Sequence, residues 1–98
     1  MAEQIFSVDE VTVERKDGKA RVKAVGRVNT TGWSDIRLAP SKEHIDPQLV
    51  GLDMVGKSPG DALVDDGYHK VEAVMDVDAD QKQGVVVYSA NDSKRAMF

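Results

Sequence analysis

The stretch VTVERKDGKARVKAVGRV, residues 11–28, decides the fold class, because its register as a β-hairpin can be worked out from the residues alone. Asp17-Gly18 at its centre is typical of a two-residue turn. Such a turn needs positive φ at both positions, a conformation that Asp tolerates and Gly adopts freely. When the two arms fold about this turn, Val13 lies opposite Val22. The sequence therefore predicts two long antiparallel strands here.

Two further pairs support this register. Val11 faces Ala24 on the same side as the first apolar pair, and Glu14 faces Arg21 on the other side. A slip of one residue would send the apolar residues of the two arms to opposite faces. We therefore expect an antiparallel sheet with one buried face and one solvated face.

Two irregularities are also predicted around the hairpin. The apolar positions are even up to Val8 and odd from Val11 onwards, and a strand cannot change phase without a bulge or a break. We expect this irregularity near Asp9-Glu10. Gly26, in the middle of the second arm, indicates a bulge or a close approach of another backbone.

The rest of the chain reads as further short strands separated by Gly, Pro and Asp. No segment has sustained helical periodicity, and the run Val85–Tyr88 is apolar throughout, as in a strand buried on both faces. Six or seven short strands of this spacing predict an antiparallel β-sandwich of immunoglobulin-like architecture. The expected strands cover residues 5–16, 20–29, 36–38, 49–55, 68–78 and 85–88, with 62–64 as a seventh. We expect one domain over residues 1–98, with 90–98 as a tail that frays or docks.

The composition argues against several classes of partner. The net charge is −4 with a pI near 5.0, and the basic residues are interleaved with acidic ones, which disfavours nucleic acid. No apolar run is long enough to cross a membrane. The chain has no cysteine, which excludes disulfides and thiol chemistry and favours the cytoplasm. A periplasmic location stays open if a leader peptide has been removed.

The candidate metal sites lack the spacing that metals need. Asp76, Asp78 and Asp80 have the D-x-D-x-D pattern of a calcium loop, but Gln81 and Val87 stand where that loop needs Gly and Glu. The only histidines are His44 and His69, and neither has a second ligand at a spacing typical of zinc sites. We expect no metal and no cofactor.

The sequence offers no convincing catalytic motif either. Ser41 lies close to His44, but no Gly-x-Ser-x-Gly elbow accompanies the pair. Gly56-Lys57-Ser58 is similar to the end of a phosphate-binding loop, but the upstream Gly is missing and Pro59-Gly60 prevents the helix that should follow. We therefore expect a protein that is not an enzyme.

The segment Asn29, Thr30, Thr31, Gly32 and Trp33 has two interpretations. A polar turn that presents an indole is typical of a binding loop, since Trp supplies a large contact area at small entropic cost. The only Trp of a small β-sandwich is more often part of the core, with its N–H donating to a backbone carbonyl. We favour the core for the Trp33 side chain and keep residues 29–33 as the candidate binding site.

The same segment resembles the Asn-Pro-Thr-Thr-Gly-aromatic loop of the chagasin-type cysteine-protease inhibitors, although the Pro is missing. These inhibitors are cysteine-free immunoglobulin-like sandwiches that bind the protease through three loops. Gly56–Gly60 and Arg95–Phe98 stand in for the second and third loops. The resemblance implies an inhibitor that acts through residues 29–33, with Gly56–Gly60 exposed at the same end.

A second resemblance covers most of the chain. Its pattern is similar to small bacterial β-sandwich proteins with a G-x-V-x-T-x-G-W-like segment, a family without an assigned role. The matching residues are Val22, Ala24, Gly26, Val28, Thr30, Gly32, Trp33, Leu38, Pro40, Asp53, Val55, Pro59, Gly84, Val85, Val87, Asn91 and Ser93.

From these observations we expect a non-enzymatic module that binds a protein or peptide, through loops at one end or through a sheet edge. A chagasin-like inhibitor is the alternative. An inhibitor should expose its loops at one end, whereas an enzyme should gather a histidine with carboxylates in a pocket.

Overall fold

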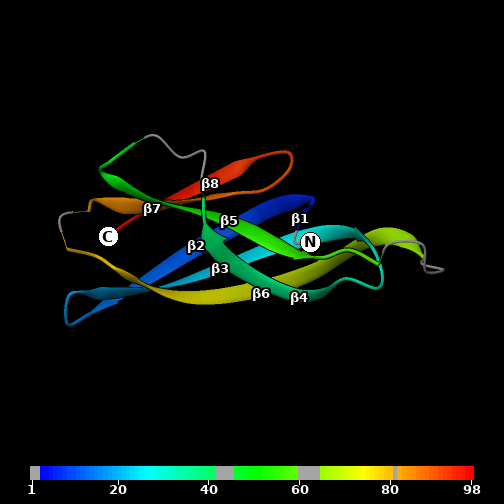
Figure 1. The fold of residues 1–98 in the computed structure, drawn as a ribbon, viewed down its shortest axis with the longest axis horizontal. Helices are drawn as coiled ribbons and strands as arrows, with labels where there is room; N and C mark the ends of the chain where they lie inside the picture. The colour runs from blue at the N-terminus through cyan, green and yellow to red at the C-terminus, as the bar shows by residue number, and fades with distance from the viewer. Residues whose placement is uncertain (1–2, 42–45, 60–64, 81) are drawn as a thin grey trace.

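The computed structural model describes residues 3–41, 46–59, 65–80 and 82–98, and these residues form eight β-strands and no helix (Figure 1). The all-β prediction is therefore confirmed, but the strands are more numerous and the longest reach 10 to 13 residues. The strands are β1 (Glu3–Gln4), β2 (Ser7–Lys16), β3 (Lys19–Thr30), β4 (Ser34–Pro40), β5 (Leu49–Lys57), β6 (Asp66–Asp78), β7 (Gly84–Tyr88) and β8 (Ser93–Met97). The strand expected at 62–64 lies outside the described residues.

The first sheet has the order β2-β3-β6 and contains the hairpin. Its register is the one expected, with Val13 opposite Val22 and Glu14 opposite Arg21. The turn residues Asp17 and Gly18 have φ of 55° and 80°, the left-handed conformation that this type of turn requires. Local turn chemistry and the period of two are enough to specify these two strands.

Both expected irregularities are present in this sheet. The register between β2 and β3 shifts between Val8 and Glu10, where the apolar positions change phase. At Gly26 a Cβ atom would lie 2.5 Å from the Ile5 Cδ1 atom and even closer to the Ser7 carbonyl oxygen. Gly26 is thus required by the close approach of the segment that links β1 to β2.

The second sheet is built around β5. One edge of β5 pairs with β4. The other edge pairs with β7 along its first half and with β1 near its end. Strand β8 pairs with the far edge of β7. The β5–β7 pair is parallel, which corrects the expectation of a purely antiparallel sandwich. The cause is that β6 crosses to the other sheet between them, so β7 returns in the direction of β5. Immunoglobulin sheets are antiparallel, so this pair is a departure from that architecture.

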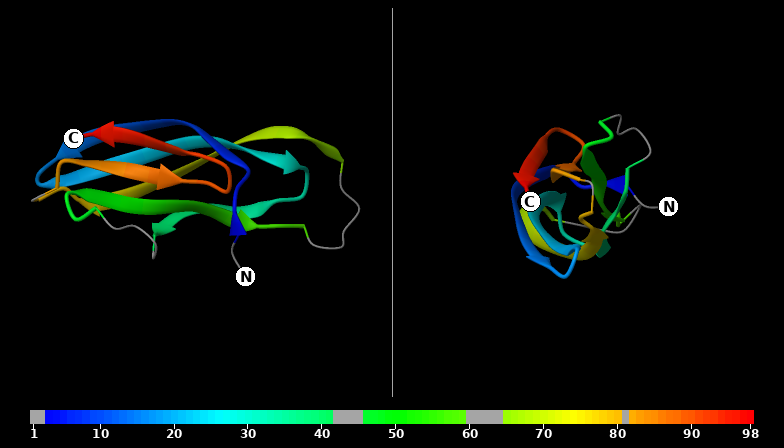
Figure 2. Two further views of the ribbon diagram at one scale, coloured as in Figure 1. Left: turned by 90° about the horizontal axis from the view of Figure 1, so that it is seen from above. Right: turned by 90° about the vertical axis from the view of Figure 1, so that its left-hand side faces the viewer.

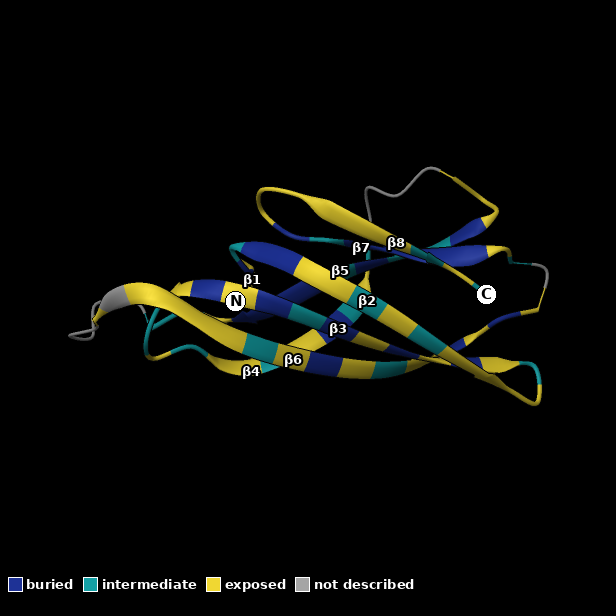
Figure 3. Cartoon of the chain, turned by 180° about the vertical axis from the view of Figure 1, so that it is seen from behind, coloured by how far each residue is buried: buried dark blue, intermediate teal, exposed yellow. Residues whose placement is uncertain are grey.

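The two sheets pack face to face into a body of 45 × 23 × 19 Å, and Figure 2 shows the long strands running along it. The edge strand β2 lies beside β8, and β4 lies beside β6. Exposed residues alternate with more buried ones along β3 and along β6 from Val71 onwards, as Figure 3 shows. By contrast, β7 is buried from Gly84 to Val87, as its unbroken apolar run predicted. The core consists of Ile5, Val8, Ala20, Val22, Ala24, Val28, Leu38, Leu52, Met54, Ala73, Val77, Ala79, Val85 and Val87.

The C-terminal segment docks instead of fraying. Its β8 pairs with β7 along its whole length, with Gly84 opposite Met97, and the Phe98 N–H donates to the Gln83 carbonyl at 3.0 Å. None of the described residues forms a helix that could cross a membrane.

Candidate functional site

The candidate binding segment, residues 29–33, connects the two sheets. Asn29 and Thr30 are the last residues of β3, and Thr31–Trp33 lead into β4 at the end of the molecule opposite the hairpin turn (Figure 1). Asn29 and Gly32 are exposed, while Thr30, Thr31 and Trp33 are half-buried. We call this segment the 29–33 loop. It offers both solvent-facing polar groups and a partly accessible indole.

The middle of this loop is fixed by a reciprocal pair of hydrogen bonds. The Thr31 N–H donates to the Asp65 carbonyl at 3.0 Å, and the Asp65 N–H donates to the Thr31 hydroxyl oxygen at 3.0 Å. The next residue, Gly32, has φ of 88°, which an L-amino acid rarely adopts. The loop therefore has a defined shape and is tied to the chain that leads into β6.

The start of β4 is bent by a second left-handed residue. Asp35 has φ of 53°, and the register between β4 and β5 shifts between Ser34 and Arg37. The Arg37 Nη1 atom donates to the Asp35 Oδ2 atom at 2.6 Å and to the Asp35 carbonyl at 3.3 Å. The guanidinium thus clamps the bend. Non-glycine residues with positive φ are uncommon and are concentrated at functional sites.

Trp33 is neither fully buried nor fully exposed. Its ring packs against the core beside Ile36, and an ideal Cβ at Gly56 would lie 3.2 Å from the Trp33 Cε3 atom. Its Nε1 atom is buried, and no hydrogen-bond acceptor contacts it in the structure described. The core interpretation is thus right for the packing, but the expected bond to a backbone carbonyl is absent. Directly after Trp33, the backbone of β4 is irregular, because its register with β5 shifts between Ser34 and Arg37.

The stretch beginning at Gly56 lies next to the 29–33 loop, because Ser34 pairs with Lys57. Lys57 is exposed and Ser58 and Pro59 are half-buried, but Gly56 is buried within β5, and Gly60 lies outside the described residues. The two segments compared with inhibitor loops therefore share one end of the molecule.

The third inhibitor-like segment is elsewhere. Arg95 to Met97 belong to β8, and Met97 pairs with Gly84. Gly84 in turn pairs with Leu49, the first residue of β5, so this segment lies at the end of the sheet where β5 begins. This segment is a strand and not a loop, and it lies far along the sheet from Lys57 at the end of β5.

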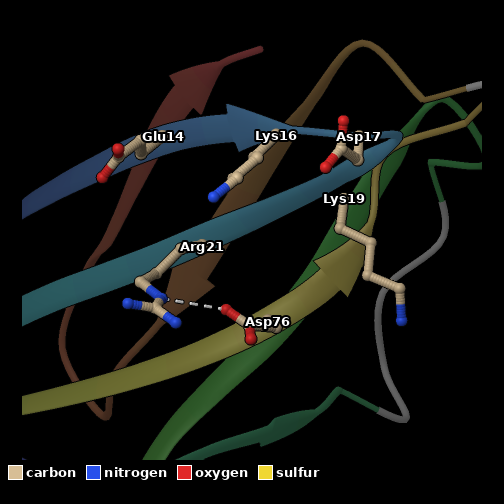
Figure 4. A pocket seen from close by; sticks show the side chains of 6 residues that line it. All are labelled: Glu14, Lys16, Asp17, Lys19, Arg21 and Asp76. Atoms are coloured by element: carbon tan, nitrogen blue, oxygen red, sulfur yellow. Dashed lines mark hydrogen bonds and ion pairs between the residues drawn. The ribbon is translucent and has the colours of Figure 1, made fainter.

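A charged depression of about 420 Å³ lies on the solvent face of the β2-β3-β6 sheet near the hairpin turn. Figure 4 shows its lining: Glu14, Lys16, Asp17, Lys19, Arg21 and Asp76. The Arg21 Nε atom and the Asp76 Oδ1 atom are 3.1 Å apart. Three basic and three acidic side chains give this depression no preference for ligands of one charge.

The candidate metal ligands that the structure describes do not converge. Asp76 is paired with Arg21, and the Asp78 carboxylate accepts the Asp80 N–H. His69 is exposed on β6 opposite Val28, and His44 lies outside the described residues, as does Gln81. Within the part of the chain that the structure describes, no three His, Cys, Asp or Glu side chains form a metal-binding group.

The structure also shows an aromatic cluster that the sequence did not reveal. The rings of Phe6 and Tyr68 have centroids 5.1 Å apart, and the Arg27 guanidinium lies 5.5 Å from the Tyr68 ring centroid. Arg27 is held by Asp9, with its Nε atom 3.0 Å from a carboxylate oxygen. Tyr68 is 61% exposed. Only the β3–β6 register, which follows from tertiary pairing, brings Tyr68 beside the end of β3.

Comparison with known proteins gives no relative for this chain: no family model, no curated protein and no solved structure matches it.

Proposed function

We propose that this chain is a non-enzymatic domain that binds a protein or peptide through the end that carries the 29–33 loop. The observation that supports this most is the reciprocal hydrogen bonding of Thr31 and Asp65, because it fixes the loop before any partner arrives. A preorganised loop loses less conformational entropy on binding. The exposed Asn29 and the nearby Lys57 supply polar contacts around the half-buried indole.

The edge strands β2, β4 and β8 are poorly suited to binding by strand addition. β2 and β4 each have a register shift, β4 also ends at Pro40, and β8 presents Lys94 and Arg95 to solvent. Bulges, prolines and charged side chains are the features that discourage the addition of another strand. This favours the loops over the edges as the binding surface.

A photo-crosslinking residue placed at Asn29 tests the proposal in cells that produce the protein naturally. We expect a discrete adduct from position 29, because this side chain is exposed at the start of the 29–33 loop. We expect no adduct from position 16, because Lys16 lies beside the hairpin turn at the other end of the molecule. Equal adduct yields from both positions, or no adduct from position 29, would contradict the proposal.

A chagasin-like protease inhibitor is the second candidate, and the pairing of Ser34 with Lys57 favours it by placing two of the three loops together. The position of Arg95–Met97 within β8 weighs against it. If the protein is an inhibitor, titration into papain reduces protease activity, and Gly32→Ala abolishes this effect by distorting the loop. Gly18→Ala is the matched control, since Gly18 is also left-handed but lies at the other end. Papain that keeps full activity with excess protein excludes this candidate.

An immunoglobulin-like relationship is likewise a proposal. The packing of two β-sheets, one of them with the order β2-β3-β6, supports it. The parallel β5–β7 pair counts against it, because the sheets of immunoglobulin domains are antiparallel.

A further inference from the structure

The Trp33 indole N–H is a buried donor without an acceptor. Among the described residues, the Nε1 atom of Trp33 shares this condition only with the Ser7 hydroxyl. A buried polar group that has lost its hydrogen bond to water without gaining another destabilises the conformation that buries it. A conformation in which this N–H meets an acceptor gains that free energy but loses the packing of the ring against the core.

The docked ring depends on a glycine. A Cβ atom at Gly56 would lie 2.5 Å from the Ile36 Cδ1 atom and 3.2 Å from the Trp33 Cε3 atom. Both side chains come from the segment that opens β4 and lie over the β5 backbone. A single added methyl group at this position would overlap the Ile36 side chain and crowd the indole packed beside it, which weakens the docked state.

The chain is held by hydrogen bonds on both sides of Trp33, and two residues near Trp33 have left-handed backbone conformations. Thr31 is bonded to Asp65 on one side, and Arg37 holds the Asp35 carboxylate on the other. Gly32 and Asp35 are both left-handed. Residues at the ends of elements can absorb the backbone rotation of a local hinge. Trp33 can thus change position while the two anchored residues stay in place.

We propose that Trp33 is a conformational switch of the loop. In the free protein its ring is docked on Gly56 with the N–H unpaired, and in the complex it turns outward and its N–H donates to a backbone carbonyl of a bound extended peptide. This inference rests on the proposed binding function and adds the chemistry of the contact. Binding selects the outward state because only that state offers the N–H to the peptide carbonyl.

The first test needs no partner, because the chain has a single Trp and so a single indole N–H signal. ¹⁵N relaxation dispersion of this signal is expected to show exchange with a minor state on the microsecond-to-millisecond timescale. Gly56→Ala is expected to shift the signal toward that minor state, to red-shift the emission and to raise its quenching by iodide. A flat dispersion profile for the unmodified protein would overturn the proposal, whether or not the variant folds.

The second test separates the N–H from the ring. Trp33→Phe keeps an aromatic ring but removes the donor on which the contact with the partner depends. The yield of the adduct formed from position 29 should fall at least several-fold. Thr12→Val, an exposed change on the far part of β2, is the control and should leave that yield unchanged. A Trp33→Phe protein that forms the adduct in full yield would contradict the switch.

The two proposals fail in different ways. If an adduct forms from position 29 but the indole shows no exchange, the loop binds a partner and Trp33 is a fixed structural residue. If the indole exchanges but position 29 gives no adduct, the binding function fails, and with it the role given to the outward state.

Discussion

At Gly26 the packing depends on the absence of one atom. The Ile5 side chain and the Ser7 carbonyl occupy the space where a Cβ would lie, and Ile5 itself is fully buried. Neither neighbour can move without disturbing the core, because protein interiors are close-packed.

Gly26→Ala is therefore expected to lower the free energy of unfolding by about 1–3 kcal/mol, the usual cost of overpacking. Urea denaturation followed by far-UV circular dichroism measures this change. Lys23→Ala, on the solvent face of the same strand, should stay within about 0.5 kcal/mol of the unmodified protein. A Gly26→Ala protein as stable as this control would show that β2 does not pack against β3 as described.

Asp92 ties the β7–β8 turn to β2. Its carboxylate accepts hydrogen bonds from the Val8 N–H and the Ser89 hydroxyl. Partial burial by itself raises the pKa of this carboxyl group, but these two hydrogen bonds, with the positive charges of Lys94 and Arg27, together lower the pKa below its ordinary value. The carboxylate is thus stabilised in its charged form in the folded protein.

The consequence for acid stability follows from the sign of this shift. Because the pKa is lower in the folded state, Asp92 contributes its full stabilisation above the unfolded pKa of about 3.9, and this is lost as the pH falls through the folded value. Asp92→Asn should therefore lower the Tm at pH 7, and the gap from the unmodified protein should shrink below about pH 4. Thermal melts between pH 7 and pH 2 measure this gap. A gap that is constant over this range would contradict the assignment.

At the scale of elements, the hairpin is specified by its turn. Gly18 has φ of 80°, and a Cβ there would lie 3.2 Å from an Asp80 carboxylate oxygen. The neighbouring Asp17 also has positive φ, which Asn adopts as readily as Asp. Position 17 therefore tolerates Asn as well as Asp, whereas position 18 requires Gly.

Gly18→Ala is expected to cost roughly 1–2 kcal/mol, because an L-residue is strained in the left-handed region. Asp17→Asn should be neutral within about 0.5 kcal/mol and serves as the matched control. Both values come from urea denaturation. If the two variants were equally stable, the turn would not have the geometry that sets the β2–β3 register.

At the scale of the whole molecule, β8 pairs with the outer edge of the buried strand β7 and becomes the edge strand of its sheet. The β8 side chains from Ser93 to Arg95 are exposed, so the main contribution of this strand is its backbone ladder beside Val85, Val86 and Val87. Without β8 these apolar residues would form an open edge, which invites aggregation.

Removal of residues 93–98 is expected to abolish cooperative unfolding and to cause self-association, as size-exclusion chromatography and thermal melts would show. Arg95→Ala is the control, since it keeps the ladder and should unfold cooperatively as before. A truncated chain that remains monomeric and melts cooperatively would mean that β7 needs no neighbour on this side.

The features that depend on residues close together in the chain could be predicted before the fold was known. The Asp17-Gly18 turn set the register of β2 and β3, the change of phase located the bulge after Val8, and the unbroken run in β7 indicated a strand buried on both faces. These features follow from turn chemistry and from the two-residue period of a strand, which act within one hairpin.

Which distant segments meet became evident only from the packing of the whole chain. This packing placed β7 parallel to β5, docked β8, brought Tyr68 to the end of β3, and left the Trp33 N–H without the acceptor that a buried indole usually finds. The 29–33 loop could be chosen from its residues, but it is anchored at Thr31 by Asp65, which no local pattern connects to Thr31. Pairings of this kind depend on how two whole sheets pack together, and a pattern with a period of two fits many such arrangements equally well.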